Sequence, residues 1–230
     1  MNSVEQAVSV RFDLERRRRI GLAEAILADV KSPEQIAEGI SQSLAGGAPV
    51  LVTRLSADQF GALPENQRAK LDYDPVSRTA ISVEIAVGAG AAEVAIVTGG
   101  TGDLGAAREA ARTLAYHGRP SREIADVGVA GLWRLMEHRD VISQMPVVIV
   151  CAGMEGALFS VVGGLAKGVV IAVPTSNGYG VAEGGKVALD SALASCAPGI
   201  AVCNIDNGYG AACLALRVLG ARGFENLSGG

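Results

Sequence analysis

The residue whose type and setting best suit chemistry is Glu155, a carboxylate in a turn between Gly153 and Gly156. The turn directly follows Val147–Val150, an unbroken β-branched run that is typical of a central strand in a parallel sheet. Ligands of open α/β sheets bind outside the carboxyl ends of the strands, so Glu155 is a candidate to act on a ligand. An exposed glutamate favoured by the dipole of the following helix fits the sequence equally well.

A glycine-rich turn, TGGTGD at residues 98–103, ends another predicted strand. Its bare backbone N–H groups suit a phosphate, although its spacing matches neither the GxGxxG fingerprint nor a P-loop. Asp103 can cap the following helix, contact a ligand, or do both. The next predicted strand ends at Asp126, which Gly128 follows. An acid and glycines therefore recur at strand ends, and this recurrence indicates a ligand site.

Two later strand ends also carry polar side chains. The loop Thr175-Ser176-Asn177 is suited to hydrogen-bonding a ligand, although loops of this composition are often only turns. Asp206 follows the last predicted strand and can either cap a helix or hold a divalent cation, with capping slightly favoured.

The cysteines give a weaker signal. Cys196 lies just after a predicted helix, and a helix C-terminus disfavours the thiolate that a nucleophile needs. From spacing alone, Cys196 is predicted to be a small core residue. The four cysteines have no CxxC spacing and the chain has only two histidines, so we expect reduced thiols and no zinc site.

The elements that must position these residues alternate strictly from residue 94 onward. Strand–helix alternation predicts right-handed βαβ units and a doubly wound parallel sheet with helices on both faces, a three-layer α/β fold. The predicted strands span residues 94–97, 124–127, 147–150, 169–173 and 200–203. The predicted helices span residues 104–117, 130–139, 156–165, 184–195 and 208–219.

A small α/β domain is predicted over residues 1–91, before the domain at 92–230 that holds the parallel sheet and the candidate ligand site. We expect helices at 12–30 and from Pro33, where Ser32 and Gln35 form a capping box. A strand at 49–54, a helix at 57–69 and an irregular link at 71–81 follow. The run Arg16–Arg19 is interpreted as a solvated face rather than as a contact to a phosphate in a neighbouring subunit.

Composition narrows the class of partner. Of the 230 residues, 49% are hydrophobic but only 4% aromatic, so the core must be aliphatic. The formal net charge of −4 argues against nucleic acid or an anionic membrane as the main partner. No signal peptide or membrane-spanning run is recognised, so we expect a cytoplasmic protein.

The strand-end motifs together resemble a known family. In order and spacing, TGGTGDL, DVGVAGLWRL, VIVCAGMEGALFSVVGGL, VIAVPTSNGYG and SCAPGIAVCNIDNGYGAA resemble the LarB family of nickel-pincer cofactor biosynthesis. The resemblance covers residues 94–212, and DLERRRRIGLAEAI and KSPEQI extend it more loosely toward the N-terminus. The C-terminal domain of this family is similar to PurE, the carboxylase/mutase of purine synthesis.

The resemblance implies a pyridinium-3,5-biscarboxylic acid mononucleotide synthase. Such an enzyme adds CO2 to the pyridinium ring of nicotinic acid adenine dinucleotide and hydrolyses the phosphoanhydride to release AMP. It implies Cys196 as a covalent catalyst, against the spacing argument, with Glu155 taking the ring proton or holding a metal and Asp126 assisting proton traffic. Phosphoanhydride cleavage implies Mg2+, with Glu155 and Asp206 as candidate ligands. The implied substrate-binding residues are Gly99, Thr101, Asp103, Gly128, Gly153, Met154, Ser160, Thr175, Ser176 and Asn207.

Departures from the family pattern leave alternatives open. Gly100 and Gly102 replace an alanine and a serine, and Phe159 stands where a proline is common. A PurE-like mutase acting on an aminoimidazole ribonucleotide is one alternative, although Ala157-Leu158 stand where its histidine would be. A non-catalytic nucleotide-binding module is another. By analogy with the purine enzymes, we expect a high-order homo-oligomer, an octamer.

Overall fold

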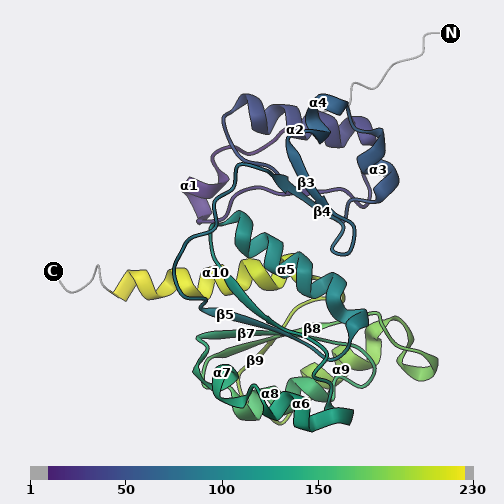
Figure 1. The fold of residues 1–230 in the computed structure, drawn as a ribbon, viewed down its shortest axis with the longest axis vertical. Coiled ribbons are helices and arrows are strands. Elements are labelled where there is room, and N and C mark those ends of the chain that lie inside the picture. Colours follow the sequence, from purple (N-terminus) through teal and green to yellow (C-terminus); the bar gives the residue numbers. More distant parts are fainter. Residues whose placement is uncertain (1–9, 226–230) are drawn as a thin grey trace. The chain divides into compact units, whose positions relative to one another are not determined.

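The computed structural model describes residues 10–225, which form two compact units that divide between Ile85 and Ala86 (Figure 1). Each unit has its own sheet and its own hydrophobic core. No helix in the described part of the chain is long and apolar enough to cross a membrane.

The first unit is a four-stranded mixed sheet with strand order β1-β2-β4-β3. The β1–β2 pair is parallel, and the other two pairs are antiparallel. The strands are β1 (Ile26–Leu27), β2 (Leu51–Thr53), β3 (Leu71–Asp74) and β4 (Thr79–Ser82). The helices are α1 (Arg16–Ile20), α2 (Pro33–Ala45), α3 (Ala57–Ala62) and α4 (Glu65–Arg68). The capping box predicted for Ser32 and Gln35 is confirmed at the start of α2.

Three predictions for this unit are wrong. The helix predicted over residues 12–30 is limited to α1, because Gly21 ends it in the left-handed conformation (φ 77°) and Ile26 then pairs with β2. The helix predicted over 57–69 is split into α3 and α4 at Pro64, which cannot continue a helix from α3. The link predicted over 71–81 is the β3–β4 hairpin, whose turn is closed by the Asp74 carboxylate accepting from the Ser77 N–H at 3.0 Å.

The second unit is a five-stranded parallel sheet with strand order β6-β5-β7-β8-β9. Its strands are β5 (Val94–Thr98), β6 (Ser121–Ile124), β7 (Val147–Ala152), β8 (Val169–Pro174) and β9 (Ile200–Val202). Its helices are α5 (Leu104–Tyr116), α6 (Leu132–Met136), α7 (Arg139–Gln144), α8 (Ala157–Leu165), α9 (Lys186–Leu193) and α10 (Gly208–Glu225). The predicted doubly wound parallel sheet is confirmed.

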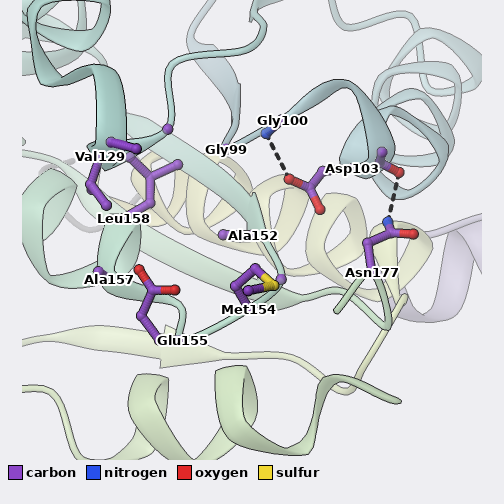
Figure 2. Close-up of a pocket in the computed structure, with 14 residues that line it drawn as sticks. Gly99, Gly100, Asp103, Val129, Ala152, Met154, Glu155, Ala157, Leu158 and Asn177 are labelled. Carbon is purple, nitrogen blue, oxygen red and sulfur yellow. Dashed lines mark hydrogen bonds between the residues drawn. The ribbon is translucent and has the colours of Figure 1, made fainter. Parts of the chain in front are cut away.

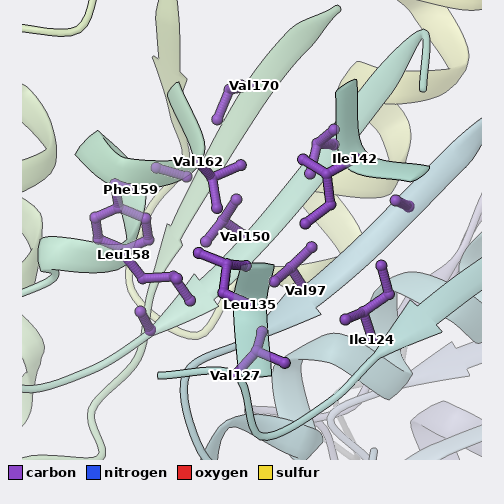
Figure 3. Close-up of a cluster of buried hydrophobic side chains, with 14 of the residues drawn as sticks. Val97, Ile124, Val127, Leu135, Ile142, Val150, Leu158, Phe159, Val162 and Val170 are labelled. Atoms are coloured by element: carbon purple, nitrogen blue, oxygen red, sulfur yellow. The ribbon is translucent and has the colours of Figure 1, made fainter. Parts of the chain in front are cut away.

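Helices cover both faces of this sheet. α5 and α10 pack on one face, and α6, α7, α8 and α9 pack on the other (Figure 1). On the face covered by α6, α7, α8 and α9, Leu135, Phe159 and Val162 belong to one buried cluster with the strand side chains Val97 and Val150 (Figure 3). All six residues of β7 are buried, as expected for the central strand. The sheet is therefore rigid where its strands end at the glycine turns.

Two elements differ from prediction in this unit. The strand predicted over 124–127 lies three residues earlier, as β6. The prediction missed its position because this edge strand carries exposed Arg122 and Glu123 and therefore has no apolar run. The helix predicted over 130–139 is replaced by a 3-10 turn (Val129–Gly131) and α6, with α7 following.

Candidate active site

A cavity of about 420 Å3 opens at the carboxyl ends of β5, β7 and β8 (Figure 2). This is the edge at which open parallel sheets bind their ligands. The cavity is lined by Gly99, Gly100, Gly102, Asp103, Gly128, Val129, Ala130, Ala152, Gly153, Met154, Glu155, Ala157, Leu158 and Asn177. Six predicted site residues are therefore brought together here: Gly99, Asp103, Gly128, Gly153, Met154 and Glu155.

Asp103 holds the glycine turn after β5 in shape. Its side chain is 5% exposed and accepts a hydrogen bond from the Gly100 N–H at 2.8 Å. The hydroxyl of Thr175, which is fully buried, donates to the other carboxylate oxygen at 2.5 Å. Asp103 thus caps the 3-10 turn Thr101–Asp103 rather than α5, and it also lines the cavity.

The variant Asp103→Asn tests this bracing. Asparagine keeps an acceptor for the Gly100 N–H, but its NH2 group can bond Thr175 only with the hydroxyl as acceptor, so two charge-assisted hydrogen bonds become neutral ones. We expect the free energy of unfolding to fall by about 1–3 kcal/mol. The measurement is denaturant unfolding against Asp140→Asn, a matched change at a carboxylate whose side chain is 80% exposed. Equal effects at the two positions would contradict a bracing role.

A second turn, after β7, carries Glu155 at the cavity (Figure 2). Met154 and Gly156 flank it in the left-handed region, at φ 52° and φ 64°. For a non-glycine residue such as Met154 that conformation is strained, and strain of this kind gathers at functional sites. Glu155 itself is exposed, so its carboxylate is accessible to a ligand in the cavity.

Asn177 joins the loop after β8 to the glycine turn, since its side-chain amide donates to the Gly102 carbonyl at 2.6 Å (Figure 2). The sequence singled out this polar loop but placed the ligand contacts at Thr175 and Ser176 instead. Thr175 lies behind Asp103, and the Ser176 N–H donates to the Asp206 carboxylate at 2.9 Å. The polar composition of the loop predicted ligand contacts, but the fold shows that Asn177 is the side chain that lines the cavity.

The side chains of Asp206 and Asn207 accept hydrogen bonds from backbone N–H groups. Asp206 holds the β8 loop through Ser176, and its own N–H donates to the Pro174 carbonyl at 2.8 Å. Asn207 caps α10 by accepting from the Gly210 N–H at 2.8 Å. The helix cap expected at Asp206 is therefore one residue further along, at Asn207.

Asp126 and Thr101 are neighbours in sequence of residues that line the cavity. The Asp126 carboxylate pairs with Arg134 at 2.5 Å, and its N–H donates to the Thr98 hydroxyl at 3.0 Å. Thr101 is exposed between the lining residues Gly100 and Gly102. Neither belongs to the described residues that line the cavity.

Cys196 and Ser160 are not among the described residues that line the cavity. Cys196 is exposed on the loop between α9 and β9, which leads into the amino end of β9, whereas the cavity opens at the carboxyl ends of the strands. The hydroxyls of Ser160 and Ser195 are 2.7 Å apart, so this loop is tied to α8. Among the described residues, the lining of the cavity therefore includes Glu155 but not Cys196.

The thiols differ in reactivity. Burial raises the pKa of the Cys151 thiol well above its ordinary value, and the nearby charges of Asp103 and Glu109 raise it further. Cys151 is therefore neutral at mildly alkaline pH, where an exposed thiol begins to ionise. We expect alkylation of the native protein to modify Cys196 and to spare Cys151 until denaturant is added, as read by peptide mass spectrometry. Modification of Cys151 in the native protein would contradict its burial.

The cavity offers few ligands for a metal. Across the described residues, no group of three or more histidine, cysteine, aspartate or glutamate side chains is gathered for an ion. Mg2+ in nucleotide enzymes is held by one or two carboxylates together with substrate phosphates. Glu155 fits such a shared ion, whereas the Asp206 carboxylate already accepts from Ser176 and does not fit.

Comparison with known proteins agrees with this architecture. Residues 4–84 match the LarB/PurE-like N-terminal domain, and residues 93–227 match the AIR carboxylase domain. An uncharacterized protein from Methanocaldococcus jannaschii is 46% identical over 122 residues, which cover 52% of this chain and 46% of that protein. The match thus spans about half the length of the curated relative. The two domains support a carboxylase-type function. With a LarB-type N-terminal domain followed by a PurE-like AIR carboxylase domain, the chain belongs to the LarB family.

Proposed function

We propose that this protein carboxylates the pyridinium ring of nicotinic acid adenine dinucleotide and hydrolyses its phosphoanhydride, giving pyridinium-3,5-biscarboxylic acid mononucleotide and AMP. The observation that carries the proposal is one cavity that combines a glycine turn for phosphate with an accessible carboxylate, Glu155. Backbone N–H groups of residues 99–102 suit the anionic phosphates, and Glu155 suits the cationic ring.

The proposed chemistry begins with a nucleophile, because a cationic ring does not attack CO2 by itself. The Cys196 thiolate adds to the ring, and the resulting enamine carbon attacks CO2 to form the new carbon–carbon bond. Glu155 takes the proton from that carbon, and the ring regains its aromatic cation as the thiolate leaves. Water then cleaves the phosphoanhydride and AMP departs. Mg2+ would neutralise charge during that cleavage, and Glu155 would be a candidate ligand for it if the carboxylate does not serve as the base.

The proposal includes an assembly of several copies, because Cys196 is not among the described residues that line the cavity of its own chain. Exposed apolar side chains support such an assembly. Trp133 is 67% exposed and follows the lining residues Val129 and Ala130, and Leu193 is 68% exposed three residues before Cys196. Contact between these two side chains in neighbouring copies would bring Cys196 toward a cavity and cover apolar surface. By analogy with the purine enzymes, the assembly is a homo-octamer.

The variant Glu155→Gln tests the role of the carboxylate. Glutamine keeps the size of the side chain but cannot take a proton, so the dinucleotide should still bind while turnover falls by about 10²–10⁴-fold. The measurement is formation of the dicarboxylated product at saturating dinucleotide, with binding followed by calorimetry. Glu123→Gln, on exposed β6, is the matched control and should keep full activity. Unchanged turnover in Glu155→Gln would remove Glu155 from the mechanism.

A PurE-like reaction is the second candidate, because the matched domain is the AIR carboxylase domain. The histidine expected for that reaction is absent where Ala157-Leu158 follow the central turn. Parallel assays with nicotinic acid adenine dinucleotide and with an aminoimidazole ribonucleotide separate the two candidates. We expect turnover only of the dinucleotide. Turnover of the ribonucleotide alone would overturn the proposal, and binding without turnover of either would favour a nucleotide-binding module.

A further inference from the structure

We infer that the N-terminal unit carries a second binding site, built for the phosphate group of a small organic anion. A cavity of about 330 Å3 lies where the segment before α1 meets β1 and the start of α2. It is lined by Val10, Arg11, Phe12, Arg16, Glu24, Ala25, Ile26, Leu27, Lys31, Gln35 and Gly39. This cavity belongs to the first unit alone, so the inference is independent of the proposed reaction.

The cations of this cavity are available. Within the described residues, Arg11, Arg16 and Lys31 form no ion pair. The other arginines of the basic run behave differently. Arg18 pairs with Glu15 at 2.7 Å on the surface, and Arg19 pairs with Asp13 at 2.5 Å. The solvated face predicted for the whole run therefore does not describe Arg16, which is partly buried against the cavity.

The charge of the site fits a phosphate monoester. Three cations against the single carboxylate of Glu24 leave a formal charge of +2 (3 − 1). The Glu24 carboxylate already accepts from the Asp13 N–H, so it is engaged on the protein side. A phosphate monoester carries about −1.5 to −2 at neutral pH and offers three acceptor oxygens. One such group would satisfy all three cations.

The cavity also has an apolar wall and a fixed shape. Phe12, Ile26 and Leu27 line it beside the cations, so the organic part of a ligand has a surface to cover. The Gln42 side chain accepts from the Phe12 N–H at 2.9 Å and donates to the Val10 carbonyl at 2.9 Å. These bonds fasten the segment that carries Arg11 to α2, so the site is formed before a ligand arrives.

The test compares two double variants of the full chain in equilibrium dialysis against AMP, inorganic phosphate and adenosine. Arg16→Gln with Lys31→Gln removes two cations from the cavity. Arg17→Gln with Arg18→Gln removes the same charge from exposed positions on α1. Because a charge-assisted bond contributes about tenfold or more in affinity, we expect the first variant to lose one equivalent of bound AMP per chain and the second to keep it. The single variant Lys31→Gln and circular dichroism check that the loss is not unfolding.

The three probes separate the sources of the phosphate. Tighter binding of AMP than of inorganic phosphate would assign a mononucleotide, which also uses the apolar wall. Equal binding of both would assign the phosphate group alone. Equal loss of AMP in the two double variants, or adenosine binding as tightly as AMP at this site, would overturn the inference.

Discussion

Replacement of Cys196 by alanine is expected to abolish carboxylation while the dinucleotide still binds. Without the thiolate, the pyridinium ring stays electrophilic and has no nucleophilic carbon for CO2. We therefore expect the rate to fall by at least about 10³-fold. Affinity for the dinucleotide should change little, because the glycine turns and Glu155 are untouched. The measurement is product formation at saturating substrate, with calorimetry for binding.

The control for this variant is Cys213→Ala, which removes a partly buried thiol from α10. It should keep the activity of the unsubstituted protein, because alanine suits a helix interior. Carboxylation at the normal rate in Cys196→Ala would contradict covalent catalysis by this residue.

Gly153→Ala is expected to lower the stability of the protein strongly. A Cβ at Gly153 would overlap the Asn177 carbonyl oxygen and lie within 2.9 Å of the Thr175 hydroxyl oxygen. Backbone at the ends of two paired strands cannot move aside as a flexible side chain would. We expect the free energy of unfolding to fall by about 2–4 kcal/mol, measured by denaturant unfolding. Ligand binding should weaken as well, because this approach forms one wall of the cavity.

Gly164→Ala is the matched control, a glycine in α8 where an added Cβ meets nothing within 4 Å. Alanine in a helix interior is favoured over glycine, so this change should stabilise the protein by about 0.5–1 kcal/mol. If Gly153→Ala kept or raised the free energy of unfolding, as Gly164→Ala should, the close approach of the two loops would not require glycine at this position.

The fold of the second unit can be predicted from sequence because each strand and turn is indicated by a short local pattern. Runs such as Val147–Val150 are apolar on both faces, and each is followed by a glycine turn and a helix, so the strand–helix order fixes the sheet. The first unit was harder to predict. Its hairpin carries polar residues such as Asp72 and Asp74, and β1 is only two residues long, so pairing with β2 decides its conformation rather than its own pattern.

Part of the site was predicted because its turns also have local sequence signals. The turns after β5 and β7 were recognised from glycines and acids, and both line the cavity. Asn177 was missed as a lining residue, since the direction of a loop side chain depends on the partner it meets, here the Gly102 carbonyl. That Cys196 does not line the cavity could not be predicted from sequence, because it depends on how the loop between α9 and β9 packs against α8.

The most direct test of the proposed reaction is mass spectrometry of the purified protein incubated with nicotinic acid adenine dinucleotide, 13C-labelled bicarbonate and Mg2+. The proposal predicts AMP together with a dicarboxylated pyridinium mononucleotide that carries the label in its new carboxylate. Both products should disappear in Cys196→Ala. A dinucleotide that binds but yields neither product would contradict the proposal.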